Sequence, residues 1–393
     1  MKTKQKLLSR SILIFSAIIS LSCAHTNKRD IASTKNEIIP NTWTPPNWLS
    51  YEAIGYDVNT FAVPEGLKKD VDFWIKIYTQ YTTKQGVFHI AGDTQKTLGD
   101  FDLTQVYANQ KWSAVRKELE SELLIKRHKR ILAKRHKIPI EKIRIQMGLK
   151  DRMEEAIKVS GMYLPMMEKI FEAEKIPKEL TRVVFVESSF NIEAQSKVGA
   201  SGLWQIMPNI GKSYKYISDE QDLRNHPLYA TKVAAKIFKQ NYQILKSWPL
   251  AVTGYNHGVG SMGKIVKKYK SNDIAYLINN VNSNKSFGFA SRNFYATYLA
   301  ALYVESHANL YFPEPIYKHP PLNVKYLKLT KKFSYDDLLA LFNNDEKLLR
   351  LYNPHIKKQY LKKGKTLPAG VIANIPPEKK TRLAESGSEE PDI

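Results

Sequence analysis

Cysteine is almost missing from this chain of 393 residues, since Cys23 is the only one. A single cysteine excludes an internal disulfide. The apolar run from Ile12 to Leu21 is too short to span a bilayer stably. His257 has no second histidine at ligand spacing, so we expect a turn residue there and no metal site or other cofactor.

Acidic residues are scarce relative to basic ones, with 38 Asp and Glu against 60 Lys and Arg, a net charge of +22. Such a charge calls for an anionic partner or surface. The basic residues are spread rather than grouped, which argues against nucleic acid. Teichoic-type polymers, anionic lipid headgroups, peptidoglycan carboxylates or a plain solubility effect remain open. The run from Lys126 to Arg130 is interpreted as a solvated helix face rather than a polymer or membrane contact.

The first 23 residues predict an export signal, with Lys2, Lys4, Lys6 and Arg10 before the apolar run. Cys23 at its end resembles the acylated cysteine of a bacterial lipoprotein box, although Ser20 and Leu21 depart from the usual pattern. That resemblance implies a lipid anchor at Cys23, and Ala24 after it implies the outer membrane, facing the periplasm. The alternative is an ordinary cleaved secretion signal. Either interpretation places the protein in the cell envelope.

The region before residue 146 predicts a polar tether and then a helical N-terminal region. The tether covers residues 24–46 and the helical region residues 47–145. Residues 85–93 fit a short strand or an extended loop. Residues 102–137 predict one long helix, whose apolar positions are Leu103, Val106, Val115, Leu119 and Leu123.

Glu187 stands at the end of a helix that Pro177 is expected to open. Leu180, Val183 and Val184 precede it by seven, four and three residues, so the carboxyl shares a face with apolar side chains. Desolvation there raises a carboxyl pKa, which a proton donor near neutral pH needs. The tight turn from Gly199 to Gly202 predicts a close backbone approach to a ligand or to Glu187 itself.

This stretch and a later one together resemble the signature of the lytic transglycosylases of glycoside hydrolase family 23, the branch with a Trp in the motif. The matching pieces are Glu187-Ser188, Ser196, Gly199-Ala200, Gly202 to Pro208, and Tyr255-Asn256-His257-Gly258. The resemblance implies a mainly α fold. Residues 146–310 would form a lysozyme-like catalytic domain.

The resemblance also implies the roles of single residues. Glu187 would be the catalytic acid and base, and Ser196 would hold the substrate acetamido group. Gln205 and Met207 would position the sugar, Tyr255 would hold Glu187 or the substrate, and Asn256 would bind sugar or support the fold. In the last signature element Phe294 replaces the family's Tyr, so Tyr295 is the weaker substitute. Tyr163 is interpreted as core rather than groove.

Only one carboxylate falls on a motif position, whereas ordinary glycosidases use two unless the substrate assists. The resemblance therefore implies non-hydrolytic cleavage of peptidoglycan glycan strands, which leaves 1,6-anhydromuramoyl ends. A goose-type lysozyme-like hydrolase and a non-catalytic peptidoglycan-binding lipoprotein are the alternatives.

The end of the chain predicts a small α+β module over residues 322–377. A strand, two short helices and a second strand resemble a degenerate LysM module, which implies binding to N-acetylglucosamine polymers. A purely structural cap is the equal alternative. Residues 378–393 are polar and are expected to be disordered.

Overall fold

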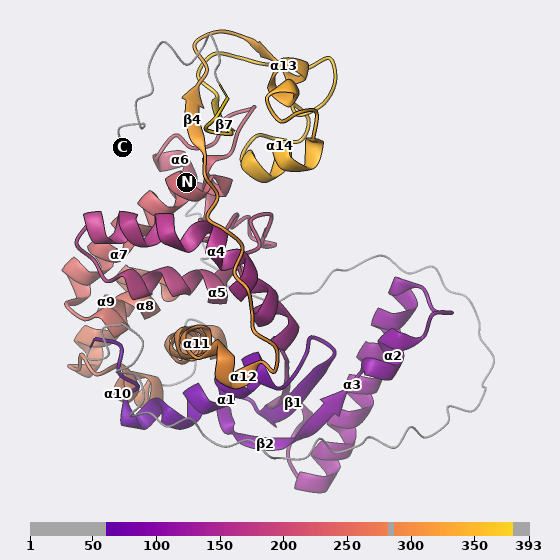
Figure 1. The fold of residues 1–393 in the computed structure, drawn as a ribbon. Helices are drawn as coiled ribbons and strands as arrows, with labels where there is room; N and C mark the ends of the chain where they lie inside the picture. The colour runs from indigo at the N-terminus through magenta and orange to yellow at the C-terminus, as the bar shows by residue number, and fades with distance from the viewer. Residues whose placement is uncertain (1–59, 282–286, 380–393) are drawn as a thin grey trace, which may run out of the picture.

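The computed structural model describes residues 60–281 and 287–379 (Figure 1). The predicted signal peptide, the lipid-anchor residue Cys23, the tether and nearly all of the polar tail lie outside these ranges. No helix in the described ranges is both long enough and apolar enough to cross a membrane.

The described chain is mainly helical, as predicted, and its largest core surrounds one buried helix. That helix, α11, is seen nearly end-on in Figure 1, with α1, α5, α8 and α12 around it. Its apolar residues from Phe294 to Val304 are all buried, so it forms the axis of the domain. The helices of this domain are α4 (Lys150–Ala173), α5 (Val183–Glu187), α6 (Pro208–Ser213), α7 (Pro227–Leu245), α8 (Trp248–His257), α9 (Val259–Tyr269), α10 (Ile274–Asn280), α11 (Phe289–Ser306) and α12 (Ala308–Tyr311).

Local chemistry explains where these helices begin and end. Proline stands in the first turn of α6, α7 and α8, where its missing N–H costs no hydrogen bond. Gly258 ends α8 with a φ of 89°, a conformation that favours glycine. Helix α4 continues through Pro165. Tyr163 is 2% exposed and belongs to the core, as predicted.

The N-terminal region is not purely helical, which corrects the prediction for residues 47–145. Its strands form a three-stranded antiparallel sheet in the order β2-β1-β3. Phe88 in the central strand pairs with Ile145 and packs on Phe101, so the sheet has a small core of its own. The elements are α1 (Lys68–Thr79), β1 (Gln85–Ile90), β2 (Asp93–Asp102), α2 (Thr104–Ala108), α3 (Ala114–His136) and β3 (Ile143–Met147).

Helix α1 packs against α11 and shares its core, so the boundary predicted at residue 146 does not separate two cores. Phe61 packs edge-on against Tyr298 with ring centroids 5.7 Å apart. Trp74 donates its indole N–H to Asn293 at 3.1 Å. Residues 61–81 are therefore physically part of the helical domain.

The predicted long helix over residues 102–137 is two helices, because α2 ends at Ala108 and α3 begins after Ser113. The Ser113 hydroxyl accepts a hydrogen bond from the Arg116 N–H and caps α3. Val115, Leu119 and Leu123 are exposed and not inward, so part of the apolar pattern marks a surface.

The last part of the chain forms the predicted small α+β module with a separate core. Leu327 in β4 pairs with Ala373 in β7, and Phe333 in β5 pairs with Leu367 in β6. Figure 1 shows this module beyond α6, away from α10. Its elements are β4 (Lys325–Lys328), β5 (Phe333–Ser334), α13 (Tyr335–Ala340), α14 (Glu346–Tyr352), β6 (Thr366–Leu367) and β7 (Ile372–Ile375).

Candidate active site

Glu187 is the last residue of α5, and its supporting face is apolar as predicted. A 3₁₀ turn, Lys178–Arg182, leads into α5, and Leu180, Val183 and Val184 beneath it are all 0% exposed. The Glu187 side chain keeps partial contact with solvent. Burial nevertheless raises the pKa of its carboxyl from 4.5 to about 8. At neutral pH the carboxyl is therefore mostly protonated, as a general acid must be.

The backbone turns sharply just after Glu187. Ser189 and Phe190 have φ angles of 50° and 56°, in a region that costs non-glycine residues of order 1 kcal/mol each. Phe190 is buried against Phe185 at a centroid distance of 4.8 Å, and the Ser188 hydroxyl donates to the Leu203 carbonyl at 2.9 Å. These contacts hold the strained turn and join the end of α5 to the following loop.

The loop from Gly199 to Met207 folds back on itself through a bridge between Ser201 and Ile206. Gly202 has a φ of 77°, and a Cβ there would lie 2.3 Å from the Arg224 carbonyl oxygen. Glycine at 202 is thus required for contact with the segment at Arg224 and not with Glu187, which was one of the two predicted alternatives.

Trp204 anchors this loop in the core. Its ring is 0% exposed and stacks on Phe171 at 5.5 Å, and its indole N–H donates to Thr231 at 2.9 Å. Its carbonyl accepts a 2.7 Å hydrogen bond from the Tyr255 hydroxyl. The Tyr255 ring in turn stacks on Phe238 at 4.7 Å. Tyr255 is thereby fixed against the loop.

Tyr255 lies near Glu187 but its hydroxyl is committed to a backbone carbonyl. Burial first, and then the charge of Glu187, raise the pKa of Tyr255 well above its usual value. The structure thus brings Glu187 and Tyr255 together as predicted. The hydroxyl holds the loop, and no hydrogen bond to the Glu187 carboxyl is seen among the described residues.

Three of the remaining predicted residues, Ser196, Gln205 and Met207, lie in or beside this loop. Ser196 caps a turn, because its hydroxyl accepts from the Ala200 N–H at 2.9 Å. Gln205, at a φ of 46°, donates its amide to the carbonyls of Ala194 and Gly202. Met207 is 38% exposed beside them.

Asn256 follows Tyr255 and connects α8 to the start of α11. Its side-chain oxygen accepts a 3.0 Å hydrogen bond from the Ser291 hydroxyl, and that hydroxyl also lies 3.3 Å from Nδ1 of His257. Asn256 therefore has a supporting contact at the end of the site, and its amide nitrogen stays available.

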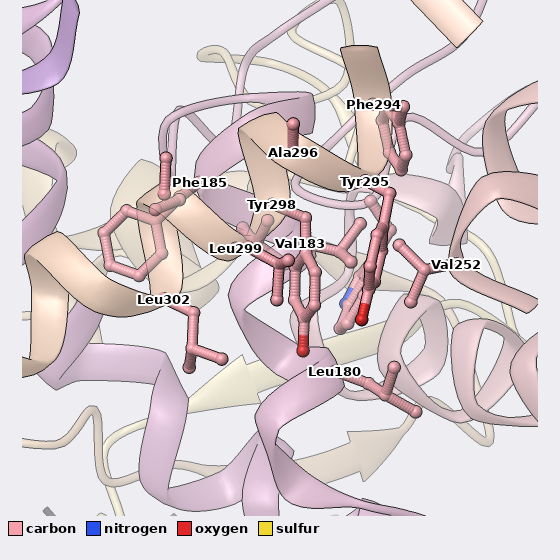
Figure 2. Packing of buried hydrophobic residues seen from close by; sticks show 14 of the residues in the cluster. Leu180, Val183, Phe185, Val252, Phe294, Tyr295, Ala296, Tyr298, Leu299 and Leu302 are labelled. Carbon is pink, nitrogen blue, oxygen red and sulfur yellow. The ribbon is translucent and has the colours of Figure 1, made fainter. Parts of the chain in front are cut away.

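The Tyr295 side chain is buried in the core and has no exposed surface that a sugar can contact. It is 0% exposed, and its hydroxyl has no hydrogen-bond partner. In Figure 2 it points in the same general direction as Tyr298, toward Leu180. The prediction of Tyr295 as a substrate-binding residue is wrong because its side chain is buried. A shift of one residue along a helix rotates a side chain by about 100°, so Tyr295 and Phe294 lie on different sides of α11.

Arg224 is a site residue that sequence reasoning missed. Its guanidinium donates to the Gly199 carbonyl at 2.7 Å and to the Ile206 carbonyl at 3.0 Å, so it spans the signature loop. Asp222 holds the guanidinium in place through contacts of 2.6 to 3.2 Å. In the sequence, the only indication was an acidic residue two positions before an arginine. That pattern is too common to predict that the arginine holds a loop in place.

The C-terminal module contacts the same segment. The Asp222 N–H donates to the His355 carbonyl at 2.8 Å, and the Gln221 side chain accepts from the Ile372 N–H at 3.0 Å. Nε2 of His226 lies 2.9 Å from Oδ1 of Asn374, fully buried. Lys358 also pairs with Glu193 at 3.0 Å. The module is thus packed against the back of the site.

Two carboxylates near the site, Glu193 and Asp222, each form an ion pair. Glu193 is bound to Lys358 and Asp222 to Arg224. No group of three or more His, Cys, Asp or Glu side chains suited to a metal ion occurs within residues 60–281 and 287–379. The site therefore offers one desolvated carboxyl, that of Glu187, which lies beside a rigid loop and a tyrosine.

Residues 166–278 match the model of the transglycosylase SLT domain family. The chain is 33% identical to membrane-bound lytic murein transglycosylase D of Escherichia coli K12 over 98 residues, which are 24% of this chain and 22% of that protein. It is 30% identical to a putative tributyltin chloride resistance protein of an Alteromonas species over 119 residues, 29% of this chain and 58% of that protein. The chain thus spans only about a fifth of the transglycosylase relative.

Two solved structures are also similar. One is an inactive mutant of the lytic transglycosylase Slt from Pseudomonas aeruginosa, with 19% identity, a TM-score of 0.30, and coverage of 39% of this chain and 25% of that one. The other is the 70 kDa soluble lytic transglycosylase of Escherichia coli, with 19% identity, a TM-score of 0.31, and coverage of 38% and 24%.

Proposed function

We propose that this protein is a peptidoglycan lytic transglycosylase with Glu187 as its single acid and base. The observation that carries the proposal is the burial of Glu187, which raises the pKa of its carboxyl to about 8. The similarity to lytic transglycosylases over the SLT domain supports the same substrate.

The proposed reaction cleaves the β-1,4 bond between N-acetylmuramic acid and N-acetylglucosamine. Glu187 protonates the glycosidic oxygen while the substrate acetamido oxygen attacks the anomeric carbon. The Glu187 carboxylate then accepts the proton of the C6 hydroxyl, whose oxygen displaces the acetamido oxygen. No water is consumed, and the product ends in a 1,6-anhydromuramoyl residue. We assign contacts with the sugar to Ser196, Gln205, Met207 and Asn256.

A goose-type hydrolase remains the second candidate, because Glu193 is near the site in sequence. Its pairing with Lys358 favours the transglycosylase. A non-catalytic sugar clamp is the third, and a proton donor with a raised pKa argues against it.

Digestion of purified sacculi followed by mass analysis tests these candidates. Anhydro-ended muropeptides, lighter than reducing ones by one water, are the expected product. Reducing muramic ends would instead establish hydrolysis. Glu187→Gln should release neither, and should still bind insoluble peptidoglycan as wild type does. A wild-type protein that binds without releasing any muropeptide would leave only the clamp.

Export and a lipid anchor at Cys23 complete the proposal, together with glycan binding by residues 322–377 as a LysM-like module. Support comes from the sequence at the N-terminus and from the α+β order of the C-terminal module. Metabolic labelling with a fatty acid tests the anchor, which Cys23→Ala should abolish. Unchanged labelling of that variant would refute it.

A further inference from the structure

A polar cavity of about 230 Å³ lies between α1, the β1–β2 turn, α10 and α11. Leu67, Ile278 and Ala296 form its apolar walls and are nearly fully buried. Asp70, Asp93 and Arg292 supply charges of both signs to its lining. It lies outside the loop that surrounds Glu187, and the proposed reaction does not use it.

Arg292 lines this cavity, and most of its guanidinium N–H groups donate to no protein acceptor among the described residues. One guanidinium nitrogen donates to the Val281 carbonyl at 2.5 Å, and no other protein partner of the guanidinium is present among the described residues. Burial lowers the pKa of Arg292, while the charge of Asp70 raises it. A carboxylate is the ligand that such a planar set of donors fits.

Asp70 lines the same cavity without forming an ion pair of 4 Å or less with Arg292. Its carboxylate accepts from the Thr94 hydroxyl and, at 3.4 Å, from the Gln95 side chain. Burial raises the pKa of Asp70. Asp70 and Arg292 attract each other across the cavity without a direct ion pair, which leaves room between them for a group that carries the complementary charges.

We propose that this cavity binds the zwitterionic end of a diamino acid in a peptidoglycan stem peptide. The ligand carboxylate would lie on Arg292 and the ligand ammonium on Asp70 and Asp93. A free amino-acid end carries both charges on one carbon, so it satisfies both partners at once. This assignment rests on the proposed function for its choice of substrate.

Helix α11 connects the cavity with the Glu187 site. Ser291, next to Arg292 in α11, holds Asn256 at the end of that site. A stem peptide that reached the cavity while its sugar lay at Glu187 would pass around this helix, which is about 10–12 Å across. Three extended peptide residues span about 10 Å.

Calorimetric titration of the full chain with meso-diaminopimelic acid tests the site. Pimelic acid, which lacks the amines, and 1,5-diaminopentane, which lacks the carboxylates, are the matched comparison ligands. We expect saturable binding of the zwitterion alone. Arg292→Met and Asp70→Asn should each weaken it at least tenfold, whereas Arg127→Met on the exposed face of α3 should leave it unchanged.

The assignment is overturned if wild type shows no saturable binding, if pimelic acid binds as well, or if Arg292→Met binds as tightly as wild type. If Asp70→Asn fails to fold by circular dichroism, Arg292→Met decides alone, because its guanidinium supports only one backbone carbonyl. Binding needs no cleavage. An enzyme inactive on sacculi that still binds the zwitterion would therefore refute the proposed function and not this site.

Discussion

At the scale of single residues, the protonation of Glu187 links activity with stability. Its folded pKa of about 8 is above its usual value of 4.5, so the folded protein holds a proton that the unfolded chain has lost between those pH values. The contribution of Glu187 to stability therefore declines as pH rises from 4.5 to 8. The same proton is the one that the proposed reaction needs.

We expect Glu187→Gln to be more stable than wild type at pH 8, by on the order of 3 kcal/mol, because glutamine carries no charge to desolvate. The difference should vanish near pH 4, where Glu187 is protonated in both states. Urea unfolding at the two pH values measures it. An equal difference at both would show that the effect is packing and not ionisation.

Activity of wild type should be constant below pH 8 and should fall about tenfold per pH unit above it, because the acid form of Glu187 is lost. Initial rates of muropeptide release on sacculi measure this profile. A rate that rises through pH 8 would mean that the carboxylate form limits the reaction.

Tyr255→Phe should destabilise the protein by about 1–3 kcal/mol, because the Trp204 carbonyl loses its only side-chain donor in a buried place. Tyr242→Phe is the matched control, since Tyr242 is 37% exposed. Thermal unfolding measures both. Equal effects of the two substitutions would show that the Tyr255 hydroxyl does not hold the loop.

At the scale of elements, the signature loop depends on its contact with the segment from Asp222 to His226. Gly202→Ala would place a Cβ 2.3 Å from the Arg224 carbonyl at a φ of 77°. We expect a loss of at least about 2 kcal/mol and reduced activity. Gly260→Ala, where a Cβ meets open space inside α9, should be neutral or stabilising. A Gly202→Ala variant as stable as Gly260→Ala would contradict the proposed close contact.

At the scale of the whole molecule, two buried histidines join the C-terminal module to the helical domain. The rings of His226 and His355 are 4.4 Å apart, and burial lowers the pKa of His226 well below its usual value and that of His355 to about 4. Both are therefore neutral in the folded protein at pH 7. Folding favours the neutral forms, so the contribution is complete above pH 6.5 and is lost as pH falls toward 4.

We expect His355→Gln to flatten the decline in stability between pH 6.5 and 4, since a neutral amide cannot be protonated. Urea unfolding across that range measures the slope. An unchanged slope in His355→Gln would mean that protonation of His355 does not weaken the interface.

Much of the helical domain followed from local pattern. Pro177, Pro227 and Gly258 each stand within a residue or two of a helix end, because caps and proline act through the backbone beside them. The sequence pattern predicted the strands of the N-terminal region less well. Pairing of β1 with β3 joins residues more than fifty apart, which no local periodicity encodes.

The sequence by itself determined that one carboxyl, Glu187, ends an apolar helix face, because spacing fixes which side chains share a face. That Tyr255 acts with Glu187 was implied only by the family resemblance. Only the tertiary structure decided that Tyr295 is buried, that Arg224 clamps the loop, and that Asp70 and Arg292 share a cavity. Those facts depend on how distant segments pack. Packing is set by the whole core and not by the neighbours of any one residue.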